Sequence, residues 1–218
     1  ARQTQPYFAS YDDELRVMRL GVTEQFADGW NGLNLLSAQV SQGLDILGAS
    51  GANRGNVSRY GGRDDFTKIN LSAVRRQPLA PGWAVQIAGI AQRSRTPLLL
   101  AEQFGVGGAT FGRAFDPSQI TGDDGEAGYI ELQGTRDTIY QLVPWIQYFA
   151  FFDGGETSFQ GTGVSNSQSL ASTGLGIRLR LYRTFSGEFL VAFPVAQHVS
   201  DGAPHKGNSF YFSVNADF

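Results

Sequence analysis

The sequence predicts an all-β protein built on an antiparallel sheet, and three observations lead to that fold class. Apolar and polar residues alternate in nine segments, and this period of two places them on opposite faces of a strand. Apolar spacing of three and four residues is never sustained, so no helix is predicted. The 218 residues include 28 glycines and 8 prolines, a content that indicates many turns within one large domain.

The predicted strands follow one another along the chain, separated by turns and loops. They cover residues 13–27, 31–47, 64–78, 82–94, 127–135, 138–152, 171–184, 187–199 and 208–218. In the third strand Ile69 and Leu71 oppose Lys68, and in the seventh Arg178 and Arg180 share one face. We therefore expect a sheet with two chemically different faces.

The links between these strands differ in length. Residues 185–187 and 77–82 are predicted short turns, whereas 47–63 and 153–169 are long and rich in Gly, Ser and Asn. Short turns at one end and long loops at the other are typical of a transmembrane β-barrel, with lipid outside and a polar interior. A soluble sandwich or jelly roll shows similar punctuation, so this alternative stays open.

Composition argues against several function classes. The net charge is only -3, with 17 basic and 20 acidic residues spread along the chain, so we expect no nucleic-acid partner. The absence of cysteine excludes disulfides and thiolate metal sites. Apolar runs such as 142–146 are far shorter than the roughly 18 residues of a membrane helix. The chain opens at Ala1 without a basic and apolar leader, so we expect a processed product or a cut fragment.

No enzyme, metal or cofactor site is predicted. His198 and His205 flank Asp201 near a predicted turn, and this is the one arrangement that offers an acid–base pair. Residues 105–108 meet neither of the glycine spacings that bind phosphates, and no helix follows them. Residues 123–126 lack the spaced oxygen ligands of a calcium loop and are predicted to form a turn.

The most informative segment is the predicted loop at 95–126, between the fourth and fifth strands. It is too long for a hairpin turn, and loops of more than about 12–15 residues are usually functional or disordered. One arginine stands within a glycine-rich and aromatic run made of Gly112, Arg113, Ala114 and Phe115. We expect this loop to fold back into the barrel.

With the glycines at 107–108 before it and the run 122–125 after it, this segment resembles the sixth extracellular loop of two-partner secretion transporters. These are the haemolysin and filamentous-haemagglutinin secretion proteins of Gram-negative outer membranes. Their loop tip reads Arg-Gly-aromatic, and here Ala114 stands at the glycine position. The family's wall motif, which receives the loop arginine, is resembled by Phe151, Phe152, Asp153 and Gly154.

The end of the chain also fits this resemblance. Its alternating apolar residues look like the signal by which an outer-membrane barrel is recognised for insertion, carried by Phe210, Phe212 and Phe218. The family's barrel has sixteen strands, so residues 1–218 are expected to be its last nine strands, without the N-terminal periplasmic domains. Open strand edges are not tolerated in lipid. A missing N-terminal segment or an additional chain is therefore expected to complete the wall.

The resemblance implies a pore that secretes an unfolded partner exoprotein without nucleotide hydrolysis. Arg113 is expected to dock on Asp153, because a guanidinium presents a planar fork of donors to a carboxylate. A solvated Arg113, with Asp153 merely starting a turn, is the other interpretation of these residues. The loop phenylalanines are expected to meet the wall aromatics, Phe111 and Phe115 against Phe149 or Phe151.

Strand parity predicts which polar residues line the lumen: Lys68, Glu131, Gln133, Arg178 and Arg180. The implied partners are a secreted polypeptide, membrane lipid and, during insertion, the outer-membrane assembly machinery. Two other functions stay open, a barrel-insertion factor of the same superfamily and a passive outer-membrane porin.

Overall fold

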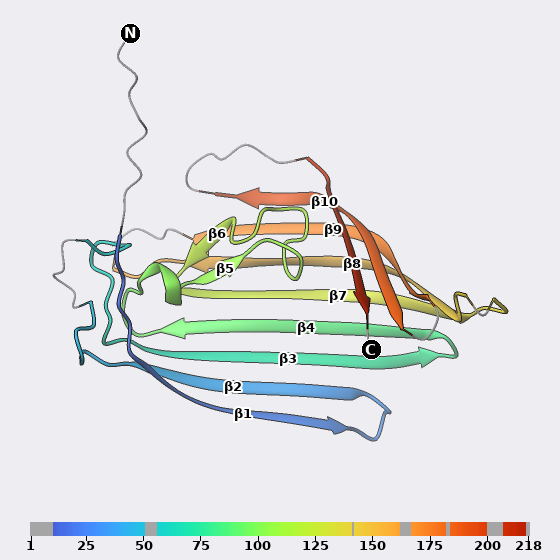
Figure 1. Cartoon of the computed structure of the whole chain (residues 1–218), viewed down its shortest axis with the longest axis horizontal. Coiled ribbons are helices and arrows are strands. Elements are labelled where there is room, and N and C mark those ends of the chain that lie inside the picture. The colour runs from blue at the N-terminus through green and yellow to red at the C-terminus, as the bar shows by residue number, and fades with distance from the viewer. Residues whose placement is uncertain are drawn as a thin grey trace, which may run out of the picture.

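The computed structural model describes residues 11–50, 56–140, 142–161, 167–181, 184–199 and 207–216. It is dominated by one sheet of nine antiparallel strands (Figure 1), which confirms the all-β prediction. In sheet order the strands are β1 (Val17–Ala27), β2 (Leu33–Gly43), β3 (Thr67–Ala80), β4 (Trp83–Ser94), β7 (Asp124–Asp137), β8 (Trp145–Ser158), β9 (Ser167–Leu181), β10 (Phe185–His198) and β11 (Ser209–Ala216). No helix among the described residues is long and apolar enough to span a bilayer.

Two of the predicted boundaries around β8 are wrong. The Thr138 N–H donates a 3.0 Å hydrogen bond to the Pro144 carbonyl outside the strand ladder, and β8 begins only at Trp145. Proline cannot donate to a strand ladder, which is consistent with a strand that starts just after it. At its other end β8 continues to Ser158, so Asp153 lies inside a strand and does not start a loop.

The predicted short links are also displaced. Residues 185–187 belong to β10, because Phe185 pairs with Leu181 on one side and Ala216 on the other. Likewise β3 runs on to Ala80, and the turn to β4 is reduced to residues 81–82. Ladder pairing on both sides satisfies the backbone polar groups of 185–187, which a free turn would leave to water.

The turn between β1 and β2 is built around one aspartate. Asp28 accepts hydrogen bonds from the backbone N–H groups of Trp30 and Gly32, each at 3.0 Å, and pairs with Arg75 of β3. The Arg75 side chain lowers the pKa of Asp28 below its ordinary value, so this carboxylate is ionised in the folded protein. The turn therefore ties three strands together at one end of the sheet.

The sheet has an apolar outer face and a more polar inner face. On β3, Ile69 and Leu71 expose 46% and 52% of their surface, whereas Lys68, next to Ile69 but on the opposite face, is only 7% exposed. On β11, Phe210 and Phe212 of the predicted terminal signal point outward and are strongly exposed. Phe218, the last part of that signal, lies outside the described residues, as do Asp201 and His205.

The chain between β4 and β7 leaves the sheet and lies along its inner face (Figure 1). β4 pairs directly with β7, so the whole segment is an excursion that we call the lumen loop, residues 95–123. It contains a short 3-10 turn, Leu100–Glu102, and two small strands that pair with each other, β5 (Phe104–Val106) and β6 (Ile120–Gly122). Its tip, residues 107–119, follows β5 and precedes β6.

The lumen loop and the inner wall share one hydrophobic core. From the loop come Phe104, Val106, Ala114, Phe115 and Ile120, and from β7–β10 come Ala127, Phe149, Phe151, Leu170, Leu190 and Ala192. Phe115, expected to pack against Phe149 or Phe151, lies in one core cluster with both. Phe111 is partly buried and packs against the same core, with its ring centroid 5.8 Å from that of Tyr129 on β7. This apolar contact fixes the loop on one part of the wall.

The sheet is not closed within the described residues. β1 and β11 are its two ends, and each pairs on one side only. The expected sixteen-stranded barrel is therefore not present in this chain alone.

Candidate functional site

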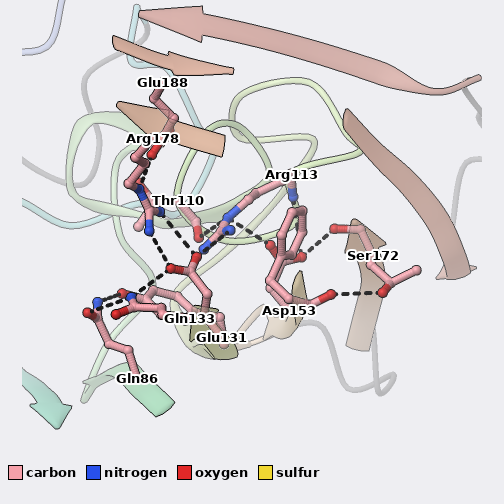
Figure 2. Close-up of polar contacts among 12 residues, drawn as sticks. Gln86, Thr110, Arg113, Glu131, Gln133, Asp153, Ser172, Arg178 and Glu188 are labelled. Atoms are coloured by element: carbon pink, nitrogen blue, oxygen red, sulfur yellow. Dashed lines mark hydrogen bonds and ion pairs between the residues drawn. The ribbon is translucent and has the colours of Figure 1, made fainter. Parts of the chain in front are cut away.

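Arg113 at the loop tip lies between two carboxylates of the inner wall (Figure 2). Its Nε is 3.2 Å from Asp153 Oδ2 on β8, and its Nη1 is 3.2 Å from Glu131 Oε2 on β7. All three side chains are buried, with Arg113 only 5% exposed. A charge held in such surroundings is stable only when opposite charges and hydrogen bonds surround it. The expected neighbour Asp153 is in place, and Glu131 is a second one.

Asp153 also holds the backbone of the tip. Its Oδ1 accepts hydrogen bonds from the N–H groups of Gly112 at 3.1 Å and Arg113 at 3.3 Å, and from the Ser172 hydroxyl of β9. The Ser172 oxygen in turn accepts the N–H of Ala114 at 3.3 Å. One carboxylate thus contacts both the guanidinium and the peptide groups of the tip, which fixes position as well as charge.

Glu131 connects Arg113 to a second arginine. Arg178 of β9 donates to Glu131 Oε1 at 2.6 Å and Oε2 at 3.2 Å, and Gln133 donates to Oε1 at 2.8 Å. Arg178 also pairs with Glu188 of β10. Charges therefore alternate in sign from Asp153 to Glu188 across four adjacent strands, and each buried charge has a partner of opposite sign.

Aromatic rings enclose both guanidinium groups. The Arg113 guanidinium carbon is 4.0 Å from the centroid of the Phe151 ring and 4.9 Å from that of Tyr129. The guanidinium carbon of Arg178 lies 3.9 Å from the Phe149 centroid. A cation over an aromatic face gains about 2 kcal/mol or more where water is excluded. The rings thus contribute to binding the charge and not only to the apolar core.

Glycine is required where the tip turns. Gly112 has a φ of +73°, and a Cβ on it would lie 2.4 Å from Leu170 Cδ1. At Gly107, where φ is +119°, a Cβ would lie 2.1 Å from the Asp116 carbonyl oxygen. These φ values are disfavoured for residues with a side chain. Ala114, which stands where the resembled family has glycine, is fully buried, and its carbonyl accepts the Ser209 hydroxyl at 3.0 Å.

A second anchor of the lumen loop was not predicted from the sequence. Glu102, in the 3-10 turn, is 2.9 Å from Lys68 Nζ of β3 and 2.6 Å from an Arg19 nitrogen of β1. Lys68 also donates to the Glu102 carbonyl at 2.8 Å. The expected lumen residue Lys68 is therefore a loop contact. Parity on β3 indicated that it faces inward, but nothing in the sequence linked Glu102 to it.

The remaining residues of the predicted site are placed as follows. Strand alternation puts Arg180 on the inner face with Arg178, whereas Phe152 is half exposed on the outer face and does not belong to the Arg113 surroundings. Gly154 is too close to β9 for a side chain, because a Cβ there would lie 2.6 Å from the Leu170 carbonyl oxygen. Glu131 and Ser172 were not expected beside Arg113, although inward parity on β7 and β9 was their signal.

Comparisons with known proteins point to one family. The family model described as haemolysin secretion/activation protein ShlB/FhaC/HecB matches residues 8–179. Among solved structures, CdiB from Escherichia coli matches with a TM-score of 0.79 at 20% identity, over 95% of this chain and 38% of that one. The chain thus spans well under half the length of that structure. No curated protein matches the sequence.

Proposed function

Because the chain belongs to the haemolysin secretion/activation family of outer-membrane transporters, we propose that it forms part of a pore that secretes an unfolded partner polypeptide. The family consists of two-partner secretion proteins of Gram-negative outer membranes, and the fold matches a member of known structure. In our proposal transport needs no nucleotide hydrolysis, and folding of the exported chain outside the cell draws it forward. The family match favours this function over barrel insertion or passive diffusion.

The docked lumen loop is the observation that carries the proposal. It packs an apolar core against β7–β10 and places the buried Arg113 between Asp153 and Glu131. A loop bound in this way narrows the lumen without blocking its reopening. When the loop undocks, water can replace the ion-pair partners of its charged residues. A covalent or purely apolar plug offers no such route to release.

We further propose that these nine strands are the last part of a closed barrel of sixteen strands. Neighbouring strands are antiparallel throughout the sheet, so β1 and β11 run in the same direction. Closing the nine alone would require a parallel seam, and single-chain bacterial barrels generally have even strand numbers. Seven further strands give an antiparallel seam at both edges. In this proposal residues 1–218 lie after the N-terminal periplasmic domains, and lipid surrounds the apolar outer face.

The test is whether the Arg113–Asp153 contact controls both loop position and secretion. In the full-length protein, Arg113→Ala and Asp153→Ala are each expected to accelerate proteolysis of the loop by more than about 100-fold, since breaking a buried pair costs about 3–5 kcal/mol and each 1.4 kcal/mol or so is a factor of ten. Secretion of the co-expressed partner exoprotein is expected to fall with both.

Arg63→Ala is the matched control, because Arg63 forms an exposed ion pair with Asp65 in the segment just before β3. It should leave proteolysis and secretion unchanged. If Arg113→Ala and Asp153→Ala behave like this control, the docking has no part in transport.

A further inference from the structure

Besides the Arg113 contacts and the Glu102–Lys68 pair, a further, partly buried ion pair holds the lumen loop at the place where it enters and leaves the sheet. Asp123, just after β6, is fully buried, and its Oδ1 accepts an Arg59 guanidinium nitrogen at 2.5 Å. The same carboxylate accepts the Leu98 N–H at 2.7 Å and the Gln160 N–H at 2.7 Å. Leu98 lies on the outgoing arm of the loop and Asp123 on the returning arm. We call these two positions the neck.

Arg59 completes this arrangement from the segment between β2 and β3. It precedes β3, and besides the carboxylate it donates to the Leu98 carbonyl at 3.2 Å and the Gln160 carbonyl at 3.3 Å. Its guanidinium carbon lies 4.7 Å from the Phe159 ring centroid. The planar fork of an arginine can serve several acceptors at once, which lysine cannot reproduce. Arg59 thus joins both arms of the neck to the segment that follows β8.

The neck contacts are separate from those of the tip. Asp123 and Arg59 exchange no hydrogen bond or ion pair with Arg113, Glu131 or Asp153 in the described part of the chain. The neck and the tip are therefore held by separate side chains, and the Glu102 contacts with Lys68 and Arg19 form a third anchor that lies between them along the chain. Sites that share no partner contribute nearly additively to stability.

We propose that Arg59 and Asp123 are positioning residues that lock the neck, and that the loop leaves the wall only when both neck and tip are released. This inference rests on the proposed secretion function, in which the lumen loop controls the pore. Releasing the tip alone then leaves the two arms of the loop held together at the neck. Releasing the neck alone lets the arms separate and weakens the packing of β5 and β6.

The experiment reports on burial of the loop core. Val106 of β5 is 1% exposed and the chain has no cysteine, so Val106→Cys supplies a single buried thiol in this segment. Full-length protein in outer-membrane vesicles is treated with a membrane-impermeant maleimide. Arg59→Lys and Asp123→Asn are each expected to raise the labelling rate about tenfold, equivalent to a loss of about 1.4 kcal/mol. Combined with Arg113→Ala, the effects on the logarithm of the rate should add.

Arg63→Lys is the control, since Arg63 lies in the same outer segment but pairs with Asp65 in solvent. Heat-modifiable migration on a gel identifies any variant that no longer forms the barrel. If Asp123→Asn fails to insert, Arg59→Lys still tests the neck, because this substitution preserves the positive charge. Labelling within about twofold of the control in both neck variants would overturn the proposal. A wild-type protein that secretes no partner would instead refute the secretion function, while the labelling rates still decide whether the neck is locked.

Discussion

Arg113 is docked by two carboxylates that make different contacts. Asp153 contacts the guanidinium and two backbone N–H groups of the tip. Glu131 is shared between Arg113 and Arg178, so it neutralises charge on both sides. Removing Asp153 therefore affects the tip geometry, whereas removing Glu131 affects the whole chain of alternating charges.

This difference leads to a prediction for Glu131→Gln. The substitution keeps the shape but leaves two guanidinium groups short of a negative partner, and breaking a buried pair costs about 3–5 kcal/mol. We expect a lower urea midpoint for the folded barrel and faster proteolysis of the loop.

Glu188→Gln is the comparison for this prediction. Among the described residues Glu188 pairs only with Arg178, and its side chain is 33% exposed, so its loss should change the urea midpoint far less. Equal effects of the two substitutions would show that Glu131 does not bridge the two arginines.

At the scale of the strand, cross-strand pairs leave room for the aromatic residues of the site. Phe149 faces Gly176 and Phe151 faces Gly174 across the β8–β9 ladder. A Cβ on Gly176 would lie 2.4 Å from the Phe149 ring, and one on Gly174 2.5 Å from the Phe151 ring. The rings therefore lie over bare backbone, in the position where they contact Arg178 and Arg113.

Alternation on β3 gives a prediction for the element as a whole. Ala73 lies on the outer face near the middle of the strand, and Ser72 next to it faces inward. Ala73→Lys is expected to destabilise the barrel by about 2–4 kcal/mol, because the ammonium group would meet lipid near mid-depth. Ser72→Lys places the same charge in the lumen and should cost much less. Urea unfolding in lipid vesicles measures both, and a larger loss for Ser72→Lys would reverse the assignment of the faces.

In the molecule as a whole, closure of the barrel depends on the two edges of the sheet, β1 and β11. β1 and β11 each leave one row of backbone groups without a strand partner within the described residues. Such groups cost several kcal/mol each in the hydrocarbon region. Both edges must therefore be paired when the protein is in its membrane.

Hydrogen exchange measures this pairing directly. In outer-membrane vesicles that contain the full-length protein, the amides of β1 and β11 are expected to be protected as strongly as those of β3, because pairing on both sides suppresses local opening. In the isolated 218-residue chain the edge amides should exchange much faster. Fast exchange of both edges in the vesicles would contradict a closed barrel.

Several features of this fold were predictable from the sequence because they depend on local patterns. Alternation at period two identified the nine strands and the inward parity of Lys68, Glu131 and Arg178. The glycine-rich run around Arg113 marked the loop tip, since its backbone requires φ values that only glycine adopts readily. Strand ends were less well predicted, because ladder pairing with a neighbour extends a strand into residues such as 185–187 that favour turns by themselves.

The sequence alone determined the face on which each strand residue lies, because side chains alternate along an extended backbone. It also located the loop tip, because the glycine-rich run around Arg113 interrupts that alternation. Which charges meet depended on how the loop folds onto the wall. Glu102 reaches Lys68 and Arg19, and Asp123 reaches Arg59, across separations in the chain that no local pattern encodes. Such pairs arise because folding the loop onto the wall excludes water, and each buried charge must then find its partner among whatever residues the sheet register brings alongside.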